Sequence, residues 1–274
     1  MLGARTILLD ALLDVARAQG DEEALRQLAV SSLPMTPGDL AHALSGTPAQ
    51  AAQAQAVAMR LDRLASLSLV TPVAGGHWVH RWTSEALGLS SETSAQQARC
   101  RRAGEFRLAR GGEQGIAYDD IREATYNFLD AGEFEQACAL ALQICEFHAA
   151  QQQTIAAVVM ASEALARLPP STAGWAPLAD VEVQGSMRLG LTERALARTR
   201  EVSAVFEQRV AAEPGRADYQ RGLSVSYSKL GDLMSALGQG EQAREFFEKS
   251  LAIRKRLAEA EPGRADYQRD LSVS

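Results

Sequence analysis

Two nearly identical segments near the C-terminal end of the sequence constrain its fold most strongly. Residues 213–226 read EPGRADYQRGLSVS and residues 261–274 read EPGRADYQRDLSVS, so the copies differ only at Gly222 and Asp270. They lie 48 residues apart. A fixed period between about 20 and 50 residues is typical of stacked-repeat proteins, in which no unit buries its apolar face alone. Such arrays generally bind other macromolecules, so we expect an interaction protein rather than an enzyme.

The composition favours helices and argues against a general nucleic-acid binder. Aromatic residues make up only 5% of the chain, whereas Ala, Leu, Glu, Gln and Arg are abundant, and these side chains lose little rotamer freedom in a helix. The net charge is −6 and the pI is about 5.4. Because nucleic-acid affinity comes from clustered Lys and Arg that neutralise phosphates, this balance predicts no nucleic-acid partner.

Neither a membrane anchor nor a disulfide framework is expected. No apolar run approaches the length that spans a bilayer, and Asp10 interrupts the apolar stretch 6–13, which has no cleavage-like site after it. The three cysteines, Cys100, Cys138 and Cys145, form no CxxC motif, which predicts neither disulfides nor a zinc site. We therefore expect a cytoplasmic protein without a metal, and cysteines packed in the core.

The clearest repeat unit resembles a tetratricopeptide (TPR) repeat, a pair of antiparallel helices. The residues that carry this resemblance are Tyr227, Leu230, Gly231, Gly238, Ala243 and Phe247. The small residues let two helices approach closely, while the aromatic residues fill the wedge between units. Helices are expected over 217–237 and 241–259, separated by the glycine turn. The second helix is long, as in bacterial TPR arrays of long period, which explains a spacing above the usual 34 residues or so.

Two less regular units are expected before it. Gly190 precedes Gly238 by 48 residues, which predicts a helix pair over 174–212, and Gly132 occupies the turn of a pair over 116–149. A further helix over 151–168 is closed by Pro169 and Pro170. The alternative is that these pairs are generic α-hairpins. Because the sequence stops partway into another expected helix, we expect either a fragment of a longer array or a face that meets a partner.

The first 90 residues predict a winged helix. Helices are expected over 2–18 and 21–31, a third begins after the N-cap Thr36, and a fourth opens at Thr47-Pro48. Two short apolar runs, 69–73 and 77–80, flank Ala-Gly-Gly and predict a β-hairpin. The predicted organisation is a winged-helix-like domain at 1–90, a helical connector at 91–115 and TPR-like repeats at 116–274.

This order is similar to the C-terminal half of bacterial STAND (NB-ARC-type) signalling ATPases, in which a winged helix follows the nucleotide-binding domain and precedes a repeat sensor. In that family a hydrophobic-His-Asp triplet at the end of the winged helix senses the β-phosphate of ADP. The matching positions are Val79, His80 and Arg81, with Arg in place of Asp. The resemblance implies that His80 contacts nucleotide when an ATPase domain is present. Otherwise His80 ends a strand and caps the following helix.

The remaining motifs and residue clusters predict neither a catalytic site nor a metal site. No segment fits GxxxxGK[ST], so we expect neither ATP hydrolysis nor a bound cofactor. His77 and His80 should point to opposite faces of a strand, and Cys145 with His148 would supply only two metal ligands. A basic cluster is expected to form a solvated helix face or to contact an acidic partner or an ATPase domain. It comprises Arg99, Arg101, Arg102, Arg107 and Arg110.

The first helices of TPR units line a concave surface, and this implies where a partner would bind. Alignment of the units by their turn glycines gives a candidate set on that face: Arg122, Tyr126, Asp180, Ser228 and Asp232. Polar groups beside one aromatic residue suit the capture of a protein or peptide through hydrogen bonds.

We therefore expect an all-α protein, a TPR-like α-solenoid of helix-turn-helix repeats preceded by a winged helix with a two-stranded β-wing. The expected function is non-enzymatic: the partner-sensing, regulatory half of a STAND-type ATPase whose nucleotide-binding domain lies elsewhere. One alternative is a free-standing TPR scaffold, which predicts the same partner affinity with and without ADP and an ATPase domain. Another is a transcription regulator that contacts DNA through Arg60 and Arg63.

Overall fold

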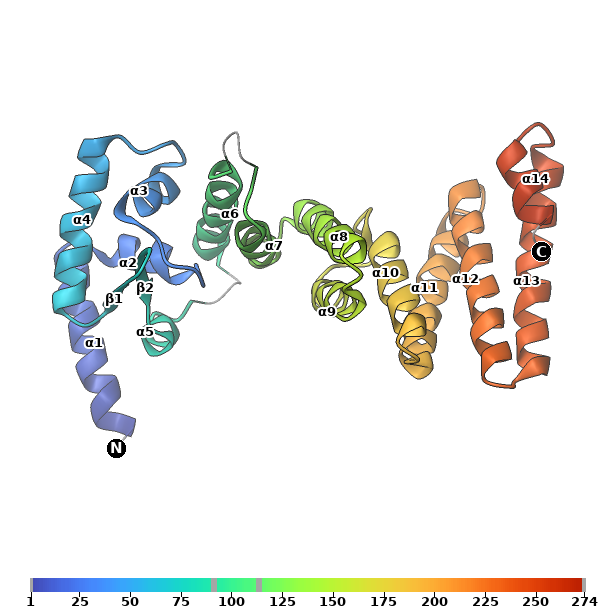
Figure 1. The fold of residues 1–274 in the computed structure, drawn as a ribbon, viewed down its shortest axis with the longest axis horizontal. Coiled ribbons are helices and arrows are strands. Elements are labelled where there is room, and N and C mark those ends of the chain that lie inside the picture. Colours follow the sequence, from blue (N-terminus) through green and yellow to red (C-terminus); the bar gives the residue numbers. More distant parts are fainter. Residues whose placement is uncertain (1, 90–92, 112–114, 273–274) are drawn as a thin grey trace. The chain divides into compact units, whose positions relative to one another are not determined.

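The chain is predominantly helical, with a single two-stranded antiparallel sheet among the residues that the structure describes (Figure 1). The structure is a computed structural model, and it describes residues 2–89, 93–111 and 115–272. The chain forms two compact units, residues 1–144 and 145–274. This architecture confirms the expectation of a helical protein with a small hairpin near its N-terminal end.

The N-terminal part of the first unit contains five helices and the hairpin. Its elements are α1 (Leu2–Ala18), α2 (Glu22–Ala29), α3 (Pro37–Ser45), α4 (Ala51–Ser66), β1 (Val70–Val73), β2 (Gly76–Val79) and α5 (Arg81–Ala86). Leucines of α2 and α4 are fully buried at its centre, among them Leu25, Leu28, Leu61 and Leu64. These residues recur at helical spacing, so one face of each helix supplies the core.

Two helix starts in this region are set by different caps. The Thr36 hydroxyl accepts a hydrogen bond from the Asp39 amide (3.1 Å), and the Asp39 carboxylate accepts one from the Thr36 amide (3.0 Å), so the predicted cap is confirmed. The start predicted at Thr47-Pro48 is wrong, because α4 begins at Ala51. The Thr47 hydroxyl lies beside that of Ser45 (3.4 Å), and the Gln53 side chain instead accepts a hydrogen bond from the N-cap amide (2.8 Å).

The hairpin pairs Val70 with Val79 and Val73 with Gly76, which confirms the predicted hairpin. Gly76 has a φ of +142°, and a Cβ on it would lie 2.3 Å from the carbonyl oxygen of Met35. This close approach lets Met35 and His77 exchange two backbone hydrogen bonds, of 2.9 and 2.8 Å. The segment between α2 and α3 therefore adds a short third pairing to the edge of the hairpin.

Two further helices of the first unit pack against each other and against the N-terminal helices. Helix α6 (Ser94–Ala109) packs on α7 (Tyr118–Ala131) and also on α2 and α3, so the segment predicted as a connector is attached to the N-terminal helices. Helices α6 and α7 approach closely, because a Cβ on Gly104 of α6 would lie 3.0 Å from the ring of Phe128 on α7. The buried carboxylate of Glu123 accepts a hydrogen bond from the Ser32 amide (2.5 Å). Helix α8 (Phe134–Ala150) follows the predicted turn and spans the division between the two units.

The second unit is a succession of helices in which each of α9 to α13 packs against the next. They are α9 (Thr154–Leu165), α10 (Trp175–Arg188), α11 (Thr192–Ala212), α12 (Ala217–Ala236), α13 (Gly240–Ala260) and α14 (Ala265–Ser272). These bounds confirm the helices expected over 217–237 and 241–259 and the pair over 174–212. Gly190 and Gly238 both have a φ of +73°, so each turn uses a conformation that favours glycine.

The sequence repeat is also a structural repeat. Arg216 donates two hydrogen bonds to Asp218, of 2.8 and 2.7 Å, and its guanidinium carbon lies 4.4 Å from the ring centre of Tyr219. In the next copy, Arg264 donates two hydrogen bonds to Asp266, of 3.0 and 2.8 Å, and its guanidinium carbon lies 4.3 Å from the ring centre of Tyr267. There the arginine lowers the pKa of Asp266 to about 2. Each copy therefore begins its helix with the same clamp of arginine, aspartate and tyrosine.

Residues that face each other across a helix pair change together from one repeat to the next. A Cβ on Gly231 of α12 would lie 2.5 Å from the ring of Phe247 on α13, so this ring occupies the space that a side chain would need. At the positions 48 residues earlier, Val183 and Thr199 are both buried. Compared with Gly231 and Phe247, the equivalent positions of the unit before therefore hold a larger residue in place of glycine and a smaller one in place of phenylalanine.

A second exchange alters the chemistry of the interface. Glu182 of α10 is 2% exposed and accepts hydrogen bonds from Arg194 (2.9 Å) and Arg198 (2.6 Å) of α11. The positions 48 residues after Glu182 and Arg198 hold Leu230, which is buried, and Phe246, which packs against the same core. A buried ion pair in one unit is therefore replaced by an apolar contact in the next, while the helices keep their arrangement.

We predict that Gly231→Val lowers the free energy of unfolding by about 1–3 kcal/mol, because the new side chain overpacks against Phe247. The double substitution Gly231→Val with Phe247→Thr copies the preceding unit and should recover most of this loss. Urea denaturation of the whole chain measures both values. Trp175 is the only tryptophan of the second unit, so a Trp78→Phe, Trp82→Phe background makes fluorescence report that unit. A double variant no more stable than the single one would contradict the compensation.

Candidate functional site

A groove of about 470 Å³ lies in the second unit, between helices α10, α11 and α12. Its apolar lining includes the half-buried ring of Phe206 and the side chain of Val225, which is 39% exposed. The lining residues are Ala176, Pro177, Asp180, Val183, Thr199, Val202, Phe206, Asp218, Arg221, Gly222, Val225, Ser226 and Lys229. An open, concave and largely apolar site with a few polar groups is typical of ligand-binding surfaces.

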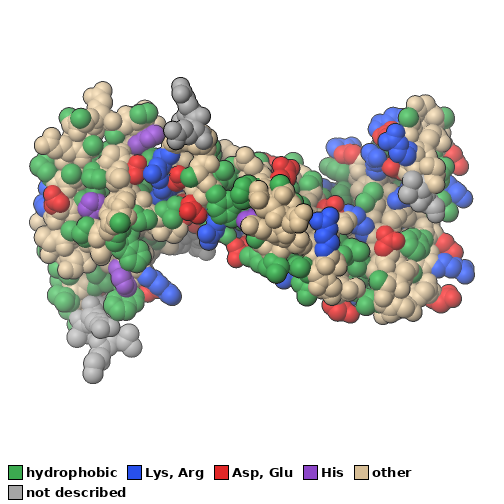
Figure 2. Space-filling model, in the orientation of Figure 1, with side chains coloured by type: hydrophobic (Ala, Val, Ile, Leu, Met, Phe, Trp, Pro, Cys, Tyr) green, Lys and Arg blue, Asp and Glu red, His purple; other side chains and the backbone are tan. Residues whose placement is uncertain are grey.

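The charged side chains that line this groove are already paired within the chain. Asp180 forms an ion pair with Lys229. Arg221 donates to Asp270 of α14 at 2.6 Å, while Asp218 is held by Arg216. Acidic and basic side chains accordingly lie next to one another over the second unit (Figure 2).

The hydroxyl groups of the lining are satisfied in the same way. Thr199 donates to the carbonyl of Ala195 at 2.7 Å, and Ser226 donates to that of Leu223 at 2.8 Å. The polar lining therefore offers a ligand few unsatisfied partners. The main favourable contribution to the binding of a ligand in this groove would therefore come from the burial of apolar surface.

The structure brings one of the three predicted partner-binding residues of this unit into the groove. Asp180 lines it, whereas Asp232 is exposed outside it. Ser228 lies near α13 instead, where its hydroxyl contacts that of Ser250 (2.8 Å) and accepts a hydrogen bond from Arg254 (2.8 Å).

The apolar residues of the groove were not predicted as site residues. Phe206 belongs to a second helix of a pair, and the expectation considered only first helices. The sequence did contain one signal, the difference between Gly222 and Asp270, because Gly222 lies directly beneath the Phe206 ring.

The other two predicted residues, Arg122 and Tyr126, lie one turn apart on α7 in the first unit. The Arg122 guanidinium carbon is 5.9 Å from the ring centre of Tyr126. A hydrogen bond with Tyr126 raises the pKa of this arginine above its usual value. Arg122 is exposed, so this pair forms a polar surface element of α7.

His80, the predicted nucleotide-sensing residue, caps helix α5. Its Nδ1 accepts a hydrogen bond from the amide of Trp82 at 3.2 Å, so Nε2 carries the proton of the neutral ring. The imidazole lies 4.7 Å from the ring centre of Trp82 and 6.1 Å from that of Trp78. Arg81, which replaces the aspartate of the family triplet, pairs with Glu85 at 2.7 Å. The geometry is the capping arrangement that the sequence offered as the alternative.

The two arginines of the alternative DNA-binding hypothesis, Arg60 and Arg63, both face a buried aspartate. Arg63 donates two hydrogen bonds to Asp21, of 2.9 and 2.7 Å, and Arg60 lies 3.9 Å from the same carboxylate. Asp21 is 0% exposed. These pairs hold α4 against the turn between α1 and α2.

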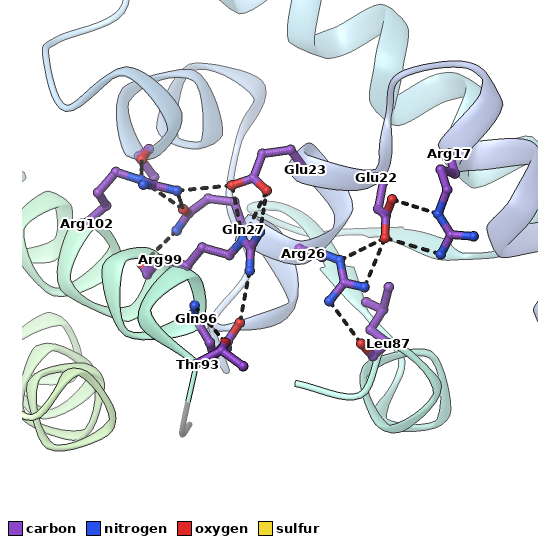
Figure 3. Close-up of polar contacts among 11 residues, drawn as sticks. Arg17, Glu22, Glu23, Arg26, Gln27, Leu87, Thr93, Gln96, Arg99 and Arg102 are labelled. Carbon is purple, nitrogen blue, oxygen red and sulfur yellow. Dashed lines mark hydrogen bonds and ion pairs between the residues drawn. The ribbon is translucent and has the colours of Figure 1, made fainter. Parts of the chain in front are cut away.

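The basic cluster of α6 is not a solvated face, as one expectation had it, because its arginines clamp α6 to neighbouring elements (Figure 3). Arg99 donates to both oxygens of Glu23 on α2, the shortest contact being 2.6 Å. Arg102 contacts the same carboxylate (3.1 Å), the Gln27 side chain (2.8 Å) and a carbonyl of α3 (3.2 Å). Long-range pairs of this kind have no local signature in the sequence.

Arg107 is the most deeply buried member of this cluster, at 0% exposed. It donates to Asp120 of α7 (3.1 Å), to the Ser31 hydroxyl (2.6 Å) and to the Leu33 carbonyl (3.0 Å). It thereby ties α6 to α7 and to the α2–α3 segment at once. Arg101 and Arg110 pair with acidic residues at more exposed positions.

The cysteines and histidines form no reactive site in the described part of the chain. All three cysteines are buried, and burial raises the pKa of Cys138 to about 11, so its thiolate is scarce at neutral pH. The Cys145 thiol faces a carbonyl of α9 (3.5 Å), and His148 contacts the Gln153 side chain (2.7 Å). Within residues 2–89, 93–111 and 115–272, no group of three or more His, Cys, Asp or Glu is placed to hold a metal ion.

Comparison with known proteins does not identify a family. No protein-family model matches this sequence, and no curated protein matches it significantly. Among the described helices, none combines the length and the apolarity needed to cross a membrane.

We predict that Arg107→Ala lowers the free energy of unfolding of the first unit by about 3–5 kcal/mol, because it removes one member of a buried, hydrogen-bonded ion pair. Arg101→Ala is the matched control. The Arg101 side chain is 51% exposed, so its ion pair with Glu133 should contribute less than about 1 kcal/mol. Urea denaturation followed by far-ultraviolet circular dichroism measures both. Equal losses for the two variants would refute the clamp.

Proposed function

We propose that this chain is a non-catalytic protein-interaction module whose second unit binds a peptide segment of a partner in the groove between α10 and α12. The observation that carries the proposal is the groove itself, which exposes Phe206 and Val225 on a face where the charges are already paired. When a partner covers apolar side chains that are exposed in this way, their burial lowers the free energy of the complex and so favours binding.

The TPR-like character of the repeats supports this role. The 48-residue period, the glycine turns and the close contact of Gly231 with Phe247 are what a stack of helix pairs requires. In this interpretation α10 and α12 are the first helices of adjacent units. The groove then belongs to the concave face on which such arrays bind partners.

The broader proposal is that the chain is the partner-sensing half of a bacterial STAND-type ATPase. It is supported by the order of elements, in which a hairpin that pairs with the Met35 segment follows the N-terminal helices and precedes the repeats. Partner binding on the repeats would then shift the winged-helix-like part relative to a nucleotide-binding domain supplied elsewhere, with His80 facing nucleotide. A free-standing scaffold is the alternative, and it differs in predicting a partner affinity independent of ADP.

The experiment selects peptides from a random 12-residue display library on the intact 274-residue chain. We expect Val225→Glu to weaken the binding of selected peptides at least tenfold, because a carboxylate would be desolvated in the groove. Val159→Glu is the matched control: Val159 is 47% exposed on α9 and does not line the groove, so affinity should change less than twofold. Fluorescence anisotropy with labelled peptides measures both. Equal affinity for the Val225→Glu variant and the unchanged chain would refute the proposed site.

A further inference from the structure

The single difference between the two 14-residue copies lies in the groove. Gly222 lines it, and a Cβ at this position would lie 2.3 Å from the Cε1 atom of Phe206. Glycine is therefore required for the ring to lie against α12. Glycine in a helix interior is unfavourable, so this contact is maintained against a local cost.

The corresponding pair of the next repeat has a different chemistry. The positions 48 residues after Phe206 and Gly222 hold Arg254 and Asp270. Arg254 donates to the backbone carbonyl of Asp270 at 3.0 Å, and the Asp270 carboxylate accepts a hydrogen bond from Arg221 at 2.6 Å. A ring over a glycine in one repeat is thus replaced by an arginine beside an aspartate in the next.

The charges of the groove favour a neutral ligand. Its lining contains two acidic residues, Asp180 and Asp218, and two basic residues, Arg221 and Lys229, so their charges cancel. Each of the four has an oppositely charged partner in the chain. A charged ligand would have to displace one of these partners, whereas an apolar side chain covers Phe206 and Val225 without breaking a pair.

We propose that the groove recognises a peptide segment through one large apolar side chain, of the leucine, isoleucine, phenylalanine or tryptophan class, which packs on Phe206 above Gly222. This inference rests on the proposed function and adds the class of ligand and the residues that determine it. Phe206 and Gly222 select the apolar anchor in this repeat, whereas the equivalent positions of the next repeat hold Arg254 and Asp270.

The test copies the next repeat into the groove. The double variant Phe206→Arg, Gly222→Asp introduces the pair that the chain already uses 48 residues later, and Phe206→Ala removes the ring while keeping Gly222. Each variant is checked for an unchanged circular-dichroism spectrum before use. Peptides selected on the unchanged chain should share one large apolar residue and bind either variant at least tenfold more weakly.

A double-mutant cycle assigns this effect to the anchor. Replacing the apolar residue of a selected peptide with alanine should weaken binding to the unchanged chain tenfold, yet change binding to the Phe206→Ala variant less than twofold. One result would overturn this inference alone: selected peptides that carry charged anchors, bind both Phe206 variants normally, and yet fail to bind the Val225→Glu variant. Peptides unaffected by Val225→Glu would refute the proposed site, and the apolar anchor with it.

Discussion

Helices in both units come close where a glycine of one helix faces an aromatic ring of another. Gly104 meets Phe128, Gly222 meets Phe206 and Gly231 meets Phe247, and in each case the ring occupies the position of a Cβ or lies within 3.0 Å of it. Each glycine costs about 1 kcal/mol of helix propensity relative to alanine. The packing of a large ring against bare backbone offsets this cost through dispersion contacts, both for the buried ring of Phe128 and for the partly exposed rings of Phe206 and Phe247. Of these contacts, the one between Gly222 and Phe206 lies in the lining of the groove, where it sets the approach of α11 to α12.

Charged residues join elements that are distant in the sequence. Glu23 of α2 holds α6 through two arginines, Asp21 holds α4, and Arg107 joins α6, α7 and the α2–α3 segment. A chain with 28 basic and 34 acidic residues therefore presents fewer free charges than its composition suggests. The two arginines of the alternative DNA-binding hypothesis, Arg60 and Arg63, are among these paired residues.

The features that follow local rules were predictable from the sequence, and those that depend on distant partners were not. The helix bounds around Gly238, the cap at Thr36 and the hairpin follow from propensity and turn chemistry, which act within a few residues. The clamp between Arg99 and Glu23 joins residues 76 positions apart, so no periodicity reveals it. Of the candidate site, Asp180 was predicted. The apolar lining residues, such as Phe206, were not, because only the first helix of each pair was considered as a binding face.

The 48-residue period conserves a backbone arrangement while the residues that face one another change in pairs. Glycine with phenylalanine, valine with threonine, and glutamate with arginine each fill the same kind of interface, so one partner changes when the other does. Because contacts in a stack are made mainly between neighbouring units, such an exchange alters one interface and leaves the rest intact. Equivalent positions of adjacent repeats can therefore acquire different chemistries on a common scaffold. The contrast between Phe206 over Gly222 and Arg254 beside Asp270 is an exchange of this kind, and the first of these two pairs lines the groove.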